Sequence, residues 1–269
     1  MSNEKESKRW NDEQWVAAWP KRERLTEALT PYLLTAASAQ PGQRVCDIGC
    51  GGGAQTIALA EAVGPTGLVV GYDISAPLVE LARERAREAG AANVEFVVTD
   101  VQTEGLGPEP FDLAVSQLGV MFFDEPLAAF GAIRAGIRTG GRLVFACWQW
   151  VEQNPWHTGT VLRPFVPPPR LPAPGKSPVG PFSLGDEEYV RDTLGGAGFG
   201  PVESHGVEIT VRAPASAVVD RSLFEFMGVP PERMDEAESA IDQHLARFAV
   251  GDGAYQYPLA FGVYQAVNG

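Results

Sequence analysis

The sequence is poor in the side chains that build metal centres and disulfide frameworks. Its 269 residues include three histidines and three cysteines, and Cys46, Cys50 and Cys147 show none of the paired spacings of such sites. This pattern favours reduced thiols over a disulfide-bonded secreted domain or a zinc site. We therefore expect no metal and a cytoplasmic location.

Long apolar runs and positive charge are scarce too. No apolar run approaches the roughly 20 residues of a membrane-spanning helix, and Met1–Trp10 is too polar for a signal peptide. Asp and Glu number 34 against 21 Lys and Arg, so the formal net charge is −13. Because such a surface repels polyanions, we expect neither a nucleic acid nor a membrane as partner. The sequence leaves the oligomeric state open.

Apolar segments alternate with helical patterns through the first half of the chain. The expected strands are 44–48, 68–73, 93–99, 111–116 and 142–148, and the expected helices between them are 54–62, 77–89 and 125–136. Strands that are apolar almost throughout and alternate with helices are typical of a parallel sheet covered on both faces. Two later strands, 202–211 and 255–267, are expected to form a hairpin that closes one sheet edge.

Segments outside this alternation are expected to cover the sheet. We divide the chain into an N-terminal helical lid at residues 1–40 and a main domain at 41–269. The main domain carries a proline-rich loop at 150–182, since prolines block regular structure, and a helical insertion at 215–250. The tryptophans of the lid either pack on the core or cover a hydrophobic substrate.

The stretch from Val45 to Gly53 is typical of a buried strand that runs into a glycine-rich turn. Gly49 and Gly51 suit positions where the backbone approaches a ligand closely. Strand, turn and helix in this order hold nucleotide-like cofactors. Asp47 would repel a pyrophosphate and attract a cofactor with a cationic amino group. Ala54 replaces only the third glycine of the dinucleotide motif, so the glycines alone leave a dinucleotide open.

Acidic residues end the next two expected strands. Asp73 can accept hydrogen bonds from both hydroxyls of a ribose, and Asp100 can accept one from an adenine amine while Val101 packs on the ring. The alternatives are a solvated aspartate at a strand end and an aspartate that forms a turn. After the fourth strand, Gln117 can orient a substrate or donate to a carboxylate.

Five motifs in this order resemble the class I S-adenosylmethionine-dependent methyltransferases. They are VCDIGCGGG, VVGYDIS, EFVVTDVQ, FDLAVSQLGVMFFDEP and GGRLVFACW, which together span Val45 to Trp148. The residues in these motifs are similar to those of a subgroup that methylates small molecules in quinone and natural-product biosynthesis. The resemblance implies a Rossmann-like α/β fold with a seven-stranded, mostly parallel sheet, helices on both faces, an antiparallel last strand, and helical and loop segments as a cap.

The resemblance also implies where S-adenosylmethionine binds. Asp47 holds its methionine amino group through water, and Gly49, Cys50 and Gly51 let the backbone pass its methionine and ribose. The backbone around Gln117 faces the methionine end. Gln117 departs from the arginine or serine usual in the family, which puts in doubt whether this position binds substrate as in relatives.

At the other end of the cofactor, the resemblance assigns the nucleoside to the second and third strands. Asp73 takes the ribose hydroxyls and Ile74 flanks the adenine. Asp100 takes the adenine amine and Val101 covers the ring.

The acceptor side is expected just past the fifth strand. His157 is the best candidate for a general base, because a neutral imidazole near its normal pKa suits that task. The alternative is a partly exposed loop histidine, and Tyr32 and Glu152 are lesser candidates. The residues expected to contact the acceptor are Trp15, Trp19, Met121, Trp148 and Trp156.

The sequence thus predicts an enzyme that transfers a methyl group from S-adenosylmethionine and leaves S-adenosylhomocysteine. The acceptor is an oxygen, carbon or nitrogen of a fairly apolar small molecule, in secondary metabolism. Two alternatives stay open. One is a protein that binds S-adenosylmethionine for a reaction other than methylation, and the other is a nicotinamide-dependent oxidoreductase.

Overall fold

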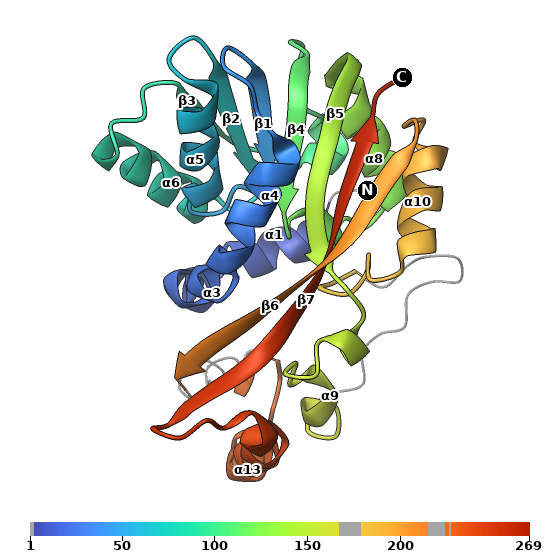
Figure 1. The fold of residues 1–269 in the computed structure, drawn as a ribbon. Coiled ribbons are helices and arrows are strands. Elements are labelled where there is room, and N and C mark those ends of the chain that lie inside the picture. The colour runs from blue at the N-terminus through green and yellow to red at the C-terminus, as the bar shows by residue number, and fades with distance from the viewer. Residues whose placement is uncertain (1–2, 167–178, 215–223, 226) are drawn as a thin grey trace.

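The computed structural model of the chain describes residues 3–166, 179–214, 224–225 and 227–269, and its core is one seven-stranded sheet (Figure 1). The strands lie in the order β3-β2-β1-β4-β5-β7-β6. Strand β7 runs opposite to the other six, which confirms the predicted Rossmann-like fold class. The strands are β1 (Arg44–Ile48), β2 (Leu68–Asp73), β3 (Val94–Val98), β4 (Phe111–Gln117), β5 (Ile137–Trp148), β6 (Val202–Pro214) and β7 (Ala254–Val267).

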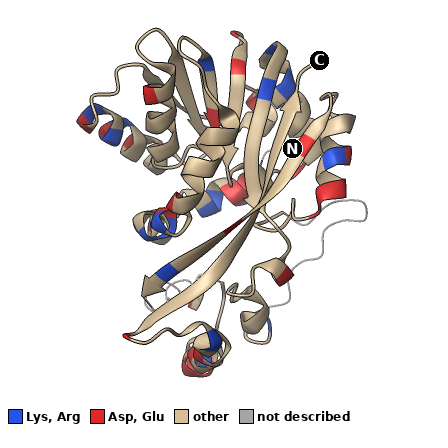
Figure 2. Cartoon of the chain, in the orientation of Figure 1, with Lys and Arg blue, Asp and Glu red and all other residues tan. Residues whose placement is uncertain are grey.

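Helices cover both faces of the sheet. The helices of the main domain are α5 (Ala54–Val63), α6 (Ala76–Glu88), α7 (Val101–Glu104), α8 (Pro126–Ala135) and α10 (Glu187–Gly196). In Figure 1, α5 lies in front of the sheet and α8 behind it. The central strands are buried almost completely because they are apolar on both sides, and β7 carries no charged residue, as Figure 2 shows.

The N-terminal segment is helical, as predicted, and lies against the carboxyl ends of the strands. It consists of α1 (Glu4–Trp10), α2 (Glu13–Ala17), α3 (Trp19–Thr26), the 3-10 turn η1 (Glu27–Leu29) and α4 (Thr30–Ala37). Pro20 stands in the first turn of α3. The backbone N–H groups of the first turn have no partner within a helix. The missing N–H of Pro20 therefore costs nothing there, and proline is compatible with the start of α3. We call residues 3–37 the lid.

Strands β6 and β7 form the predicted hairpin, and it is longer than the sheet. They pair from Val202 with Ala266 to Pro214 with Ala254, whereas β5 follows β7 only as far as the pair of Trp148 with Phe261. The remainder is a two-stranded ribbon that leaves the sheet (Figure 1).

A second, smaller core packs near the end of this ribbon. It is formed by Leu162, Phe165, Phe224, Val229, Met234, Ala237, Ile241 and Leu245. These residues come largely from α9 (Gly159–Leu162) and α13 (Met234–Leu245). Parts of the two expected covering segments, residues 167–178, 215–223 and 226, lie outside the described residues.

Two elements differ from the expectation. The strand expected at 142–148 begins earlier, at Ile137, and includes Gly140 and Gly141. The ladder with β4 is irregular between Ile137 and Arg142. Gly140 has a φ of 76° and its N–H donates to the Asn268 carbonyl at 2.6 Å, so glycine lets the strand bend at this irregularity. The short helix α7 was not predicted. It begins because the Asp100 side chain accepts a hydrogen bond from the Gln102 N–H and caps it.

We predict that Gly49→Ala destabilises the chain more than Gly90→Ala. Both glycines have positive φ, 72° and 67°, so both substitutions carry backbone strain. A β-carbon at Gly49 would also stand 2.8 Å from the Gly119 Cα, whereas nothing lies within 4 Å of one at Gly90. Gly49→Ala should lose about 1–3 kcal/mol more than Gly90→Ala in urea unfolding. Equal losses would contradict the close approach.

Candidate active site

A cavity of about 610 Å³ lies at the carboxyl ends of the parallel strands, between the sheet, the lid and the ribbon. It gathers almost every residue that the sequence proposed for a site. The predicted residues that line it are Trp15, Trp19, Asp47, Gly49, Cys50, Asp73, Ile74, Asp100, Val101, Gln117, Met121, Trp148, Trp156 and His157. Gly51 is not among the lining residues, because the Trp19 ring lies over it.

Asp47 is buried at the floor of this cavity and is 1% exposed. Its two carboxylate oxygens accept hydrogen bonds from Gln55 Nε2 at 2.8 Å and Thr56 Oγ1 at 2.7 Å. Burial raises the pKa of Asp47 to about 7, although the bonds from Thr56 and Gln55 lower it and nearby Asp73 raises it further. A cation that enters the cavity would stabilise the ionised form of Asp47 and lower its pKa.

The sequence prediction missed Gln55 and Thr56. They lie in the first turn of α5, directly after the glycine-rich turn. Their position was visible in the sequence, but the direction of their side chains was not.

Asp73 binds the glycine-rich turn. Its Oδ2 accepts the Gly51 N–H at 2.8 Å and its Oδ1 accepts the Ser75 N–H at 2.8 Å. Burial raises the pKa of Asp73, and the backbone N–H groups of Ser75, Gly51 and Ile74 lower it. Two lone-pair positions of a carboxylate remain for a ligand beyond these two bonds.

Asp100 lies at the next strand end and touches the lid. Its Oδ1 accepts the Gln102 N–H at 3.1 Å and its Oδ2 accepts the Asn3 N–H at 3.3 Å. The structure therefore brings Asp73 and Asp100 to one cavity wall. Each carboxylate accepts hydrogen bonds from backbone N–H groups.

Gln117 ties the end of β4 to the lid. Its Nε2 donates to the Thr26 carbonyl at 3.3 Å, and its Oε1 accepts from Thr30 Oγ1 at 3.0 Å. Both ends of the Gln117 amide are thus hydrogen-bonded to the lid. The sequence did not predict these contacts.

The tryptophans of the lid lie on the same side of the cavity as the glycine-rich turn. Trp10 packs edge-to-face against Trp15 at 5.3 Å, Trp19 at 6.4 Å and Phe122 at 5.1 Å between ring centroids. The Arg22 guanidinium stacks on Trp15 at 3.6 Å. These contacts give the lid an aromatic core of its own.

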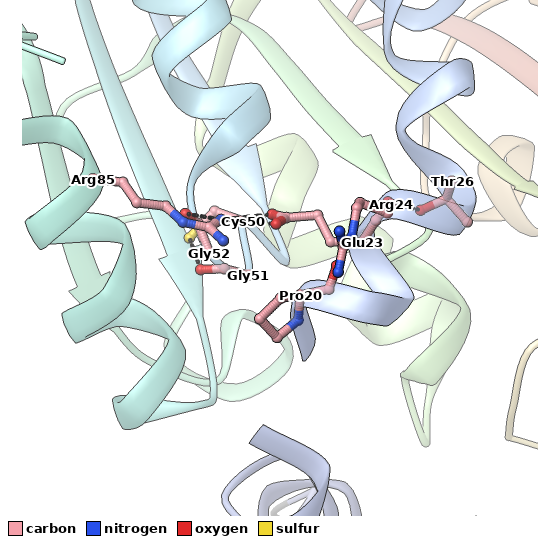
Figure 3. Close-up of polar contacts among 8 residues, drawn as sticks. All are labelled: Pro20, Glu23, Arg24, Thr26, Cys50, Gly51, Gly52 and Arg85. Atoms are coloured by element: carbon pink, nitrogen blue, oxygen red, sulfur yellow. Dashed lines mark hydrogen bonds and ion pairs between the residues drawn. The ribbon is translucent and has the colours of Figure 1, made fainter. Parts of the chain in front are cut away.

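An ion pair fastens α3 to the turn (Figure 3). Arg85 Nη1 on α6 donates to both carboxylate oxygens of Glu23, at 2.9 and 2.8 Å, and to the Gly52 carbonyl at 3.0 Å. Sequence reasoning did not find this contact, because 62 residues separate its two side chains.

The opposite end of the cavity has aromatic walls. Trp156 stacks on Tyr257 with a centroid distance of 5.7 Å and lies 5.3 Å from Trp148. Asn154, which is fully buried, holds this wall in place. Its Oδ1 accepts from the Ala260 N–H and from Trp156 Nε1, and its Nδ2 donates to the Ala260 carbonyl at 3.0 Å.

His157 lines this aromatic end and packs edge-to-face against Phe182 at 4.7 Å. Burial lowers the pKa of His157 to about 4, and the neighbouring charge of His244 lowers it as well. Its Nδ1 atom is buried and has no hydrogen-bond partner among the described residues. The imidazole is therefore neutral near pH 7. Its pKa lies well below the normal value expected from the sequence, so it is a weaker base than that expectation assumed.

The other candidate bases lie elsewhere. Tyr32 is 49% exposed, Glu152 is exposed, and neither lines the cavity. His244 hydrogen-bonds the Pro155 carbonyl from α13, and His205 lies on β6 outside the cavity.

Two further features bear on the predictions. Within the described part of the chain, no three His, Cys, Asp or Glu side chains are grouped in a way that could hold a metal ion. No helix among these described residues is long and apolar enough to span a membrane.

Comparison with known proteins relates part of the chain to a family. Residues 39–160 match the sequence model of a family described as a methyltransferase domain. Aklanonic acid methyltransferase of Streptomyces sp. (strain C5) is 36% identical over 49% of this chain, and the match spans 56% of that protein. The chain thus spans little more than half of this relative. Nocamycin O-methyltransferase of Saccharothrix syringae is 27% identical over 85% of this chain and 87% of its own.

Solved structures share the fold over nearly the whole chain. A SAM-dependent methyltransferase from Aquifex aeolicus superposes with a TM-score of 0.53 over 99% of both chains at 18% identity. The [4+2]-cyclase SpnF superposes with a TM-score of 0.55 over 90% of this chain and 80% of its own, also at 18% identity. The resemblance seen in the five sequence motifs is confirmed. The chain thus combines a Rossmann-like sheet with a segment, residues 39–160, that is similar to a methyltransferase domain.

Proposed function

We propose that this protein binds S-adenosylmethionine and transfers its methyl group to an oxygen, carbon or nitrogen of a fairly apolar small molecule, in secondary metabolism. The observation that carries the proposal is the meeting of Asp47, Asp73 and Asp100 in one cavity around a glycine-rich turn. Three acids at successive strand ends suit a ligand with a cationic amino group, a ribose and an adenine.

The cavity residues fit this cofactor on a structural ground as well. Asp47 is a buried carboxyl whose pKa is raised to about 7, so it lacks a countercharge in the protein that would fully stabilise the anion. The cofactor's amino group would supply that charge, directly or through water. When bound, S-adenosylmethionine provides an electrophilic sulfonium methyl group, and the protein provides alignment and exclusion of water.

The acceptor is assigned to the aromatic end of the cavity. Trp148, Trp156 and Met121 offer apolar walls there, and Trp15 and Trp19 belong to the lid beside the glycine-rich turn. His157 stands at the same aromatic end as a neutral imidazole. It can accept a proton from an acceptor group as the group's oxygen or nitrogen becomes the nucleophile.

The two alternatives are separated by simple measurements. The first alternative is a protein that binds S-adenosylmethionine for a reaction other than methylation. Radiolabelled methyl transfer to product distinguishes that case. A nicotinamide-dependent oxidoreductase would be stabilised by NAD or NADP. A rise in Tm with S-adenosylmethionine and none with either dinucleotide would exclude it.

Substitution of the two nucleoside acids should weaken cofactor binding. Asp73→Ala and Asp100→Ala should each cost about 1–3 kcal/mol in S-adenosylhomocysteine affinity, because each removes charge-assisted hydrogen bonds. Isothermal titration calorimetry measures this cost. Asp112→Ala is the matched control, since Asp112 also accepts a backbone N–H, from Arg44, and lies outside the cavity. Unchanged affinity in both cavity variants would refute the assignment of the acids.

Cofactor binding should release a proton from Asp47. The carboxyl has a pKa of about 7 in the structure, so at pH 6.5 it is largely protonated. A cationic amino group lowers that pKa and drives the proton off, whereas the cofactor's own amino group is already protonated at this pH. Calorimetry in buffers of different ionisation enthalpy should show release of roughly half a proton or more per site. The release should fade above pH 8 and be absent in Asp47→Asn. A wild-type binding enthalpy that does not depend on the buffer would contradict it.

His157→Ala should lower the rate of methyl transfer far more than cofactor binding. Loss of a general base costs on the order of 10²–10⁴ in turnover. Since the pKa of His157 is about 4, its protonation should not reduce the wild-type rate between pH 5 and 8. The control is His205→Ala, a histidine that is exposed on β6. Wild-type turnover in His157→Ala would remove this residue as the base.

A further inference from the structure

The lid is joined to the glycine-rich turn by one side chain that belongs to neither. Arg85 projects from α6, and its Nη1 reaches both oxygens of Glu23 on α3 and the carbonyl of Gly52 (Figure 3). The Arg85 side chain is 28% exposed and that of Glu23 is 22% exposed. A pair buried to this degree is screened less by solvent than an open surface pair.

The same part of the lid packs directly on the turn. The Trp19 ring stands so close to Gly51 and Gly52 that a β-carbon at either position would overlap it or come within 2.8 Å. The Gly51 N–H in turn donates to Asp73. A continuous set of contacts therefore runs from Glu23 through Arg85, the turn and Trp19 to the carboxylate proposed for the ribose.

The lid also contacts the ends of β2, β3 and β4. The Asn3 N–H donates to Asp100, and Asn11 Nδ2 donates to the Ile74 carbonyl at 3.2 Å. Gln117 bonds Thr26 and Thr30 at the end of β4. All of these are hydrogen bonds, while the contact between Glu23 and Arg85 is an ion pair. A ligand that spans the cavity from Asp47 to Asp100 would lie beneath the lid.

We propose that Arg85 and Glu23 are positioning residues for the cofactor, which hold Trp19 and α3 on the glycine-rich turn and must separate before the cofactor product can leave. The proposal rests on the proposed function, since it takes S-adenosylhomocysteine as the occupant. Neither residue belongs to the motifs that carry the family resemblance. Separation of the pair frees the lid at the turn, while Arg85 can keep its hydrogen bond to the Gly52 carbonyl.

The test is the release rate of S-adenosylhomocysteine from preloaded protein. Excess S-adenosylmethionine displaces the bound S-adenosylhomocysteine in a stopped-flow instrument. The rate is read from the tryptophan fluorescence of the lid or from the loss of radiolabelled S-adenosylhomocysteine from the protein. Arg85→Ala and Glu23→Gln should each release the product about three- to tenfold faster than the wild type, as expected for one charge-assisted contact. Salt should accelerate release from the wild type, because ions screen the pair, and should have little effect on either variant.

Arg87→Ala is the matched control, since Arg87 lies on the same helix with an exposed side chain. It removes the same charge and should leave both the rate and its salt dependence unchanged. Glu23→Gln keeps Arg85 and its bond to Gly52, so it tests the pair even if Arg85→Ala does not fold.

Wild-type rates and wild-type salt dependence in Glu23→Gln would overturn the positioning role while leaving the proposed function intact. Absence of any binding of S-adenosylhomocysteine to the wild-type protein would overturn both. The two failures are thus separated by the wild-type titration that precedes the kinetics.

Discussion

The site depends on a close approach between two glycines, Gly49 after β1 and Gly119 after β4. A β-carbon on Gly49 would stand 2.8 Å from the Gly119 Cα, and one on Gly119 would stand 2.7 Å from the Ile48 carbonyl. Backbones can meet at this distance only where side chains are missing. The contact brings the end of β4 against the glycine-rich turn, and Ser116 Oγ reinforces it by donating to the Ile48 carbonyl at 2.7 Å. The cavity opens directly in front of it.

The two ends of the cavity differ in chemistry because different parts of the chain build them. Short parallel strands supply the acidic end, since carboxylates stand where strands stop and backbone N–H groups are left to be bonded. Long antiparallel strands supply the aromatic end, where the ribbon carries Tyr257 beyond the sheet and Asn154 fastens the loop after β5 to Ala260. A polar ligand and an apolar one can therefore meet near the middle. This is the arrangement that transfer of a group between them requires.

The parts of the site that the sequence predicted are those encoded within a few residues. The strand of residues 44–48, its glycine-rich turn and the acids at 73 and 100 follow from apolar runs and their ends, and parallel topology then brings those ends to one edge. Parts formed by distant residues were not predicted. Nothing near Gln117 in sequence indicates Thr26 or Thr30, and nothing near Glu23 indicates Arg85. The short helix α7 was missed because its four residues show no periodicity.

The sequence by itself determined the positions of the strands along the chain, the Rossmann-like class and the acids that suit a cationic adenosyl cofactor, because each is a matter of local pattern and residue type. The tertiary structure decided how the lid lies, which side chains fasten it, and what ionisation the key groups have. Burial raises the pKa of Asp47 to about 7 and lowers that of His157 to about 4. Burial is produced by packing between segments far apart in the chain. For that reason the charge states of the site could not be read from the motifs that identify it.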